Sequence, residues 1–294
     1  MPPAPTQHVP VLAREIAEWL APSPGRTIVD GTLGGGGHTR LLAEAVSPTG
    51  LVIAVDRDAQ AVERATNELC DLPVKALQAN YSDIPEILGQ LQVSRVDGIL
   101  LDLGLSSDQL ADVDRGFSFQ SEGELDLRFD SSRGTPAWKM LERINPEHLA
   151  DLIYQYGEER YSRRIARRIA ETRRAQPIRT AADLARVVRS AVPRTRDERI
   201  DPATRTFQAL RIVVNEELKW LEVALRRLPE CLQPEGRIAI ISFHSLEDRP
   251  VKEAFRNDER LKVLTRRPVR PSDEEVALNP RSRSAKLRVA ERIT

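Results

Sequence analysis

The sequence predicts an α/β protein built on a parallel sheet, with a helical subdomain inserted into it. Three observations predict this class. A short apolar run ends in Asp30 and is followed by five glycines within Gly31–Gly37 and then by a helical pattern. Two further apolar runs without polar alternation lead into Asp56 and Asp102, as expected of strands buried on both faces. More than a hundred residues then precede the next convincing strand, far more than a crossover helix needs.

The elements in chain order alternate between strand and helix. The expected strands are residues 28–30, 51–56, 74–77, 96–101 and 237–243, followed by an antiparallel pair at 261–265 and 287–290. We therefore expect a seven-stranded sheet that begins as βαβαβ. Residues 1–108 form the first part of the main domain, 109–205 the inserted helical subdomain, and 206–294 the second part.

The insert carries clear helix-start signals. Asn145-Pro146 combines an N-cap residue with proline at the first helical position, and Thr180–Asp183 has the form of a capping box. Asp201-Pro202 is expected to cap one long helix that continues to Leu228 and returns the chain to the sheet. Residues 274–285 are expected to form a polar loop.

The glycine-rich turn predicts a site for a nucleotide-like ligand. Glycine allows a sharp bend that brings backbone N–H groups to a ligand at the positive end of the following helix. The dinucleotide pattern G-x-G-x-x-G is not met, because Thr39 stands where the last glycine belongs, and this disfavours a nicotinamide-dependent oxidoreductase. Asp56 lies about 20 residues further on, where an acid accepts ribose hydroxyls, although a role at the start of the next helix is compatible with this.

Other candidate site residues follow the carboxyl ends of buried strands. Asp102 is expected at the mouth of the same crevice, because an unpaired buried charge costs several kcal/mol and must face solvent or a partner. Ser242 and His244 come after the fifth strand and are candidate catalytic residues. Their alternatives are a cap at the end of the strand and a hydrogen-bonded loop histidine.

The charge distribution indicates a nucleic-acid partner. The 294 residues carry 44 basic and 44 acidic side chains, but residues 160–211 contain 15 arginines, no lysine and only 5 acids. The arginine fork binds phosphate through two parallel hydrogen bonds and stacks on bases. A solvated helix face is the alternative, but it would normally include compensating acids. A non-catalytic RNA-binding protein is a further hypothesis, against which Asp56 and Asp102 argue.

Cysteine content and hydropathy limit the cellular setting. Cys70 and Cys231 form no metal or redox pattern, so reduced thiols are expected. No apolar run approaches the roughly 18 residues of a membrane span, and residues 1–10 show no signal peptide. We expect a cytoplasmic protein without a membrane partner.

Several stretches resemble a known family. DGTLGGGG at residues 30–37 resembles motif I of the class I S-adenosylmethionine-dependent methyltransferases. As a whole, the chain resembles the bacterial 16S ribosomal RNA cytosine-N4 methyltransferases, which act on the decoding region of the small subunit. The matching strings occur in the same order as in that family. The matching strings are HVPVL, DGTLGGGGHTR, AVDRD, DGILLDLGLSS, RGFSF, LDLRFD, YGEERYSRRIAR, PATRTFQALRI, ISFHSLEDR and NPRSRSAKLRVAER.

The resemblance implies a class I, Rossmann-like methyltransferase sheet, S-adenosylmethionine as methyl donor without a metal, and 16S ribosomal RNA or the small subunit as partner. Methylation of another nucleic acid is the alternative. His38 and Gln109 enter the site through the resemblance alone. The implied cofactor-binding residues are Gly35, Gly36, Gly37, His38, Asp56, Tyr81, Asp102 and Gln109.

The resemblance leaves the catalytic group open among Asp102, Ser242 and His244. Amino-methyltransferases that act on DNA place an acid or Asn, two prolines and an aromatic after the fourth strand, whereas this chain has Asp-Leu-Gly-Leu at residues 102–105. Phe117, Phe119 and Trp138 either stack on the target base or belong to the core. The sequence does not decide between monomer and dimer, or between free RNA and assembled subunit as substrate.

Overall fold

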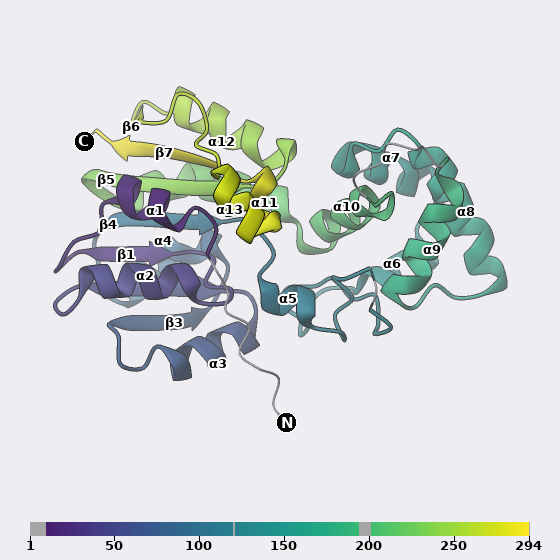
Figure 1. Cartoon of the computed structure of the whole chain (residues 1–294), viewed down its shortest axis with the longest axis horizontal. Coiled ribbons are helices and arrows are strands. Elements are labelled where there is room, and N and C mark those ends of the chain that lie inside the picture. The colour runs from purple at the N-terminus through teal and green to yellow at the C-terminus, as the bar shows by residue number, and fades with distance from the viewer. Residues whose placement is uncertain (1–9, 120, 194–200, 294) are drawn as a thin grey trace. The chain divides into compact units, whose positions relative to one another are not determined.

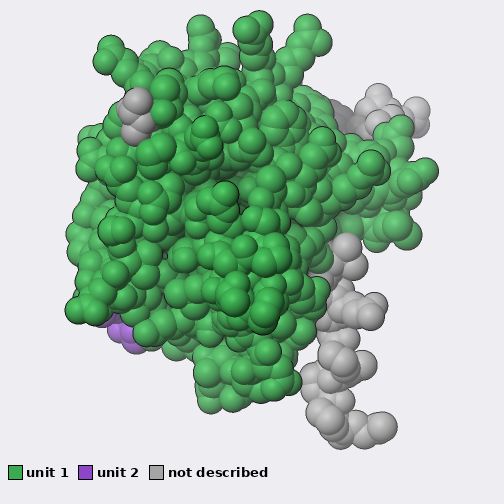
Figure 2. Space-filling model, turned by 90° about the vertical axis from the view of Figure 1, so that its left-hand side faces the viewer, with its two compact units in different colours: residues 1–106, 218–294 green, residues 107–217 purple. Residues whose placement is uncertain are grey.

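The computed structural model describes residues 10–119, 121–193 and 201–293. His8 and Val9 of the HVPVL string, and three of the fifteen arginines in residues 160–211, lie outside this range. The chain divides into two compact units, residues 1–106 with 218–294 and residues 107–217. Figure 2 shows the first unit, to which both of these segments belong, in green.

The first unit is organised around a seven-stranded sheet with the order β3-β2-β1-β4-β5-β7-β6 (Figure 1). Neighbouring strands pair in parallel except at β7, which runs antiparallel to both β5 and β6. This confirms the Rossmann-like α/β class and the antiparallel final pair. The strands are β1 (Thr27–Asp30), β2 (Leu51–Asp56), β3 (Val74–Gln78), β4 (Val96–Asp102), β5 (Leu232–Ser242), β6 (Leu261–Val263) and β7 (Lys286–Arg292).

Helices cover both faces of this sheet (Figure 1). Alternate residues of β4 face opposite layers, since Ile99 and Leu101 belong to one apolar cluster and Leu100 to another. This is why β4 reads as a continuous apolar run. One layer contains α1 (Ala13–Leu20), α2 (Gly37–Val46) and α3 (Ala59–Glu68), and the other contains α4 (Ile84–Gln90), α11 (Glu217–Arg227) and α12 (Ser245–Asn257). The 3₁₀ segments η1 (Tyr81–Asp83) and η2 (Leu228–Cys231) precede α4 and β5.

The second unit is helical. It contains α5 (Ser107–Ala111), α6 (Ala137–Arg143), α7 (Pro146–Gly157), α8 (Ser162–Ala175), α9 (Ala181–Ala191) and α10 (Ala203–Asn215). Asn145 caps α7 by accepting from the N–H of Glu147, and Thr180 and Asp183 form a complete capping box on α9. Both predicted helix starts are confirmed.

Two expectations about the return of the chain were wrong. The single long helix is instead α10 and α11, because Glu216 adopts a left-handed φ of 51° that ends α10. The expected polar loop contains α13 (Asp273–Leu278), whose N-cap Ser272 accepts from the N–H of Glu275, and η3 (Pro280–Ser284).

The second unit also extends further than the boundaries read from the sequence. It ends at residue 217 rather than 205, since α10 packs on α7 within it. Gly157 of α7 lies so close to α10 that a Cβ there would stand 2.5 Å from the carbonyl oxygen of Arg205. Among the described residues, no helix is both long and apolar enough to cross a bilayer.

Candidate active site

The register of the sheet brings three carboxylates to one edge. In β1, Asp30 pairs with Ala54 of β2 on one side and with Leu100 of β4 on the other. Asp56 and Asp102 each lie two residues beyond those partners, so they flank the glycine-rich loop that follows Asp30. The sequence predicted this grouping from the rule that ligands of open α/β sheets bind beyond the carboxyl ends of the strands.

The glycine-rich loop is hydrogen-bonded to both flanking acids. The N–H of Gly34 donates to Oδ2 of Asp56 at 2.8 Å, and the N–H of Asp102 donates to the hydroxyl of Thr32 at 2.6 Å. Gly34 and Gly36 have φ of 50° and 76°, which favours glycine at both positions. Gly36 is the N-cap of α2, so the first N–H groups of that helix, which have no partner inside it, open at the loop.

Asp30 is a structural carboxylate. It is fully buried, accepts from the backbone N–H of Thr32 at 3.0 Å, and accepts from the hydroxyl of Thr39 at 2.7 Å. Burial raises the pKa of Asp30 above its usual value. The acid at the end of β1 therefore fixes the loop and the start of α2, a role that the sequence did not assign.

Asp56 has an unusual electrostatic environment. Its Oδ2 accepts from Gly34 and its Oδ1 accepts from the N–H of Asp58 at 2.9 Å. Burial raises the pKa of Asp56 to about 6, although these two hydrogen bonds and their partial positive charges act in the opposite direction. The separate cap of α3 is Asp58, whose carboxylate accepts from the N–H of Gln60. Asp58, and not Asp56, is therefore the N-cap of α3. The carboxylate of Asp56 keeps lone pairs that can accept from a ligand.

His38 lies in the first turn of α2 and is 4% exposed. Its Nε2 is 3.5 Å from Oδ2 of Asp102. Within the part of the chain that the structure describes, neither ring nitrogen has a hydrogen-bond partner. A buried imidazole without partners is unfavourable unless a ligand supplies them. The resemblance indicated this residue, and its position beside Asp102 fits a ligand contact.

Tyr81 lies in η1, just after β3, and is half-buried. It packs close to the glycine-rich loop, because a Cβ built on Gly31 would lie 3.0 Å from the Cβ of Tyr81. The same Cβ would lie 2.3 Å from a methyl of Leu101. Glycine at position 31 thus allows the loop to pass between β4 and Tyr81.

The chain after β4 passes close to the end of β5. A Cβ on Gly104 would lie 2.7 Å from the ring of Phe243 and 3.1 Å from Oδ1 of Asp102. That oxygen also accepts from the N–H of Gly104 at 3.1 Å. Ser242 is 1% exposed, and its hydroxyl donates to the carbonyl of Lys286 at 3.4 Å. The hydroxyl of Ser242 thus bonds to the neighbouring strand β7. This agrees with the alternative that Ser242 caps the end of its strand.

His244 and Glu247 form a contact at the start of α12. The Nε2 of His244 lies 2.9 Å from Oε1 of Glu247, without the alignment that a hydrogen bond needs, and both ring nitrogens are buried without a partner in the described range. Glu247 is 2% exposed, and its Oε2 accepts from the N–H of Phe243 at 2.8 Å. The buried carboxylate faces the imidazole. Glu247, three residues after His244, was not among the site residues predicted from the sequence.

The remaining sequence candidates belong to the second unit. Gln109 of α5 is 6% exposed. Phe117 is buried and stacks on Phe129 with ring centroids 5.9 Å apart, and Phe119 packs edge-on to Phe207 at 4.8 Å. Trp138 is half-buried, with the guanidinium of Arg179 3.7 Å from its ring centroid. These rings pack within the unit.

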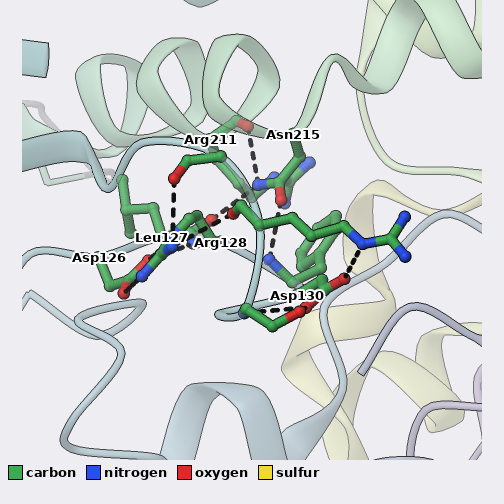
Figure 3. A network of polar contacts seen from close by, with 10 residues as sticks. Asp126, Leu127, Arg128, Asp130, Arg211 and Asn215 are labelled. Carbon is green, nitrogen blue, oxygen red and sulfur yellow. Dashed lines mark hydrogen bonds and ion pairs between the residues drawn. The ribbon is translucent and has the colours of Figure 1, made fainter. Parts of the chain in front are cut away.

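A buried polar cluster in the second unit holds the loop 126–130 to α10 (Figure 3). The amide of Asn215 donates to the carbonyls of Leu127 at 2.7 Å and Arg211 at 3.0 Å, and it accepts from the N–H of Phe129 at 2.8 Å. Leu127 is 1% exposed and has a left-handed φ of 62°, which is strained for a branched side chain. In the same loop, Arg128 binds Asp126 through two hydrogen bonds of 2.6 Å.

Among the described residues, no group of three or more His, Cys, Asp or Glu is placed to hold a metal ion. The chemistry available at the strand ends is that of backbone N–H donors, carboxylates, the buried imidazole of His38 and the half-buried imidazole of His244. Such a set can bind a nucleoside and accept a proton.

Comparisons with known proteins identify the family of the chain. A family model described as the MraW methylase family matches residues 5–293. The "Ribosomal RNA small subunit methyltransferase H" of Rhodopirellula baltica is 50% identical over 301 residues, covering 99% of this chain and 93% of the relative. The protein of the same name from Deinococcus deserti is 53% identical over 287 residues, covering 97% and 93%. A solved rRNA methylase from Streptococcus thermophilus aligns with a TM-score of 0.44 at 12% identity, covering 96% of this chain and 94% of that one.

Proposed function

The chain belongs to the MraW methylase family, and from that premise we propose that it transfers a methyl group from S-adenosylmethionine to the N4 amine of a cytidine in 16S ribosomal RNA of the small subunit. The family model matches nearly the whole chain, and relatives at 50% and 53% identity carry the name of a small-subunit methyltransferase. The resemblance found in the sequence is thereby confirmed. The observation that carries the proposal is the glycine-rich loop bonded to Asp56 and Asp102. Beside it lies the buried His38, whose ring nitrogens have no hydrogen-bond partner among the described residues.

The residues at the strand ends fit this cofactor. When bound, it supplies an electrophilic methyl group on a sulfonium centre. The backbone of Gly35, Gly36 and Gly37 at the start of α2 would face it, and Asp56 would accept its ribose hydroxyls. Tyr81, which lies beside the loop, would pack against the adenine. The orphaned nitrogens of His38 are the observation that supports this fit, because a ligand would supply the missing partners.

Asp102 is proposed to serve both cofactor and substrate. One of its oxygens is held by the N–H of Gly104 and the other lies toward His38, so the carboxylate has a fixed orientation. A hydrogen-bond acceptor aimed at the cytosine amine helps to localise the nitrogen lone pair as the new bond forms. A contact between Gln109 and the cofactor remains a prediction that rests on the resemblance.

His244 is proposed to take the proton that leaves N4. The new nitrogen–carbon bond forms as the carbon–sulfur bond breaks, and the electron pair of that bond stays on sulfur. The amine then carries a positive charge and loses one proton to the imidazole. Glu247, whose Oε1 lies 2.9 Å from Nε2 of His244, would position the ring. Ser242 has no part in this scheme, since its hydroxyl is buried and bonded to β7.

The test is methyl incorporation. Small subunits that lack this modification are incubated with the protein and radiolabelled S-adenosylmethionine, and the RNA is digested to nucleosides. Label should appear as N4-methylcytidine, and the variant Asp102→Asn should reduce it strongly. Label in another nucleoside, or in another nucleic acid only, would contradict the proposal. A thermal-shift assay distinguishes this function from that of a nicotinamide-dependent oxidoreductase. A ligand that binds the native state raises Tm, so S-adenosylmethionine should raise the Tm of the protein and a nicotinamide cofactor should not.

A further inference from the structure

Helix α8 presents an unusually basic outer surface. Its 14 residues contain six arginines and one acid, Glu171. Its inner side is fixed, because Ile165, Ala166, Ile169 and Ala170 are buried, and α8 packs against α7 and α9. The outer side is therefore held toward solvent. We call its five exposed arginines the arginine face: Arg163, Arg164, Arg167, Arg168 and Arg174.

The arginine face lacks the carboxylates that other arginines of the unit have. On α9, Arg186 pairs with Asp183 at 2.7 Å and Arg189 pairs with Asp201 at 2.6 Å. On the arginine face, only Arg168 has a carboxylate near it, that of Glu171 at 3.4 Å. Over the ranges that the structure describes, the other four guanidinium groups have no acidic partner.

This arrangement conflicts with the local preferences of a helix. Arg163 and Arg167 are four residues apart, as are Arg164 and Arg168, and like charges at this spacing repel. Arg163 and Arg164 also lie in the first turn, which contains no acid, at the helix end where the dipole disfavours positive charge. Local conflicts of this kind are expected where a partner compensates for them.

The chemistry of the face selects the partner. We propose that the arginine face binds the phosphodiester backbone of the RNA substrate, an inference that rests on the proposed function. Arg163, Arg167 and Arg174 follow one side of the helix and span about 16 Å at 1.5 Å per residue. Guanidinium groups in such a row can each take a separate phosphate through two hydrogen bonds. Such contacts provide affinity and register without reading sequence.

The test is the salt dependence of RNA binding by the full-length triple variant Arg163→Gln/Arg167→Gln/Arg174→Gln. Its affinity for protein-free 16S RNA and for assembled small subunits is measured from about 0.05 to about 0.3 M salt. Loss of three contacts to single-stranded RNA lowers the slope of log K against log salt by about 2, which is about 100-fold in affinity at 0.1 M. The triple Arg→Lys variant keeps the charge and should recover most of this loss.

The matched control removes three exposed arginines from the first unit: Arg14→Gln/Arg256→Gln/Arg267→Gln. Equal effects of the two triple variants would overturn the inference, because they would reflect net charge alone. A loss on assembled subunits only would overturn it too, since the partner would then be a ribosomal protein. The glutamine variant should bind S-adenosylhomocysteine normally, with Tm unchanged or raised by the loss of repulsion. Wild-type protein that binds the RNA but leaves it unmethylated would refute the proposed function and not this inference.

Discussion

The raised pKa of Asp56 predicts that cofactor affinity depends on pH. Burial raises the pKa to about 6 in the free protein, against a usual value of 3.8. Ribose hydroxyls that donate to the carboxylate favour its charged form, so the pKa falls in the complex. The sign follows from this difference: binding takes place with a charged Asp56, and affinity must decrease as pH falls below about 6.

The size of the effect follows from the charged fraction. At pH 5 a group with a pKa of about 6 is charged in roughly one molecule in eleven, so the apparent Kd rises about tenfold relative to pH 7.5. The slope below pH 6 is close to tenfold per pH unit. S-adenosylhomocysteine and S-adenosylmethionine should show the same dependence of Kd on pH. If they do, protonation of the ligand is not the cause of the change in affinity.

Two variants separate Asp56 from other titrating groups. Asp56→Asn cannot titrate, so its Kd should be flat between pH 5 and 7.5. Binding at pH 7.5 should be weaker than in the wild type, because a neutral amide offers the ribose hydroxyls one oxygen and no negative charge. The variant should also be less stable, because one amide oxygen cannot accept from both Gly34 and Asp58 and an unmet buried donor costs about 1–3 kcal/mol. Asp58→Asn keeps the cap on α3, since Asn caps as well as Asp. It removes a negative charge that raises the pKa of Asp56, so the profile should move to lower pH.

Isothermal titration calorimetry at a series of pH values measures all three profiles. A wild-type Kd that is equal at pH 5 and pH 7.5 would refute the reasoning about the carboxylate. An Asp58→Asn profile that moves to higher pH would show that the pKa of Asp56 is set by something other than burial and neighbouring charge.

The other predictions concern stability and turnover. Asn215→Ala leaves two backbone groups of the loop 126–130 unpaired, and should lower the free energy of unfolding in urea by about 2–4 kcal/mol, because relief of the strained loop offsets part of the loss. Gly31→Ala should cost about 1–3 kcal/mol through overpacking, seen as a lower Tm, whereas Gly89→Ala in open space on α4 should stabilise by about 0.5–1 kcal/mol; the reverse order would contradict the loop geometry. His244→Ala should lower kcat about 10²- to 10⁴-fold, Glu247→Gln less, both with the Kd for S-adenosylhomocysteine unchanged; wild-type kcat in His244→Ala would exclude it as proton acceptor.

The sequence predicted the sheet and its ligand edge because both depend on strong, short-range signals. Continuous apolar runs that end in an acid gave β1, β2 and β4, and the parallel order then placed Asp56 and Asp102 on either side of the glycines. The helix starts at Asn145 and Thr180 were predicted for the same reason, since an N-cap is a local hydrogen bond.

Features that depend on contacts distant in sequence were missed. The break at Glu216 follows from tertiary structure, because the preceding Asn215 bonds to a loop 86 and 88 residues away. The heptad-like apolar spacing continues through this break, so periodicity alone predicted one helix. Glu247 was missed because the use of its carboxylate depends on where β5 ends, which fixes the N–H of Phe243 against it.

At the strand ends of the first unit, polar residues differ in whether the chain itself supplies their hydrogen-bond partners. Asp30 and Ser242 both end strands at the candidate site, and both are satisfied by groups of the chain itself. His38 is buried and His244 is half-buried at the same edge, yet within the described residues their ring nitrogens have no hydrogen-bond partner. Since burial without a partner is costly, these two imidazoles persist only if binding supplies what the fold does not. On the arginine face of α8, four guanidinium groups have no carboxylate partner among the described residues, and the phosphates of RNA would supply the negative charge.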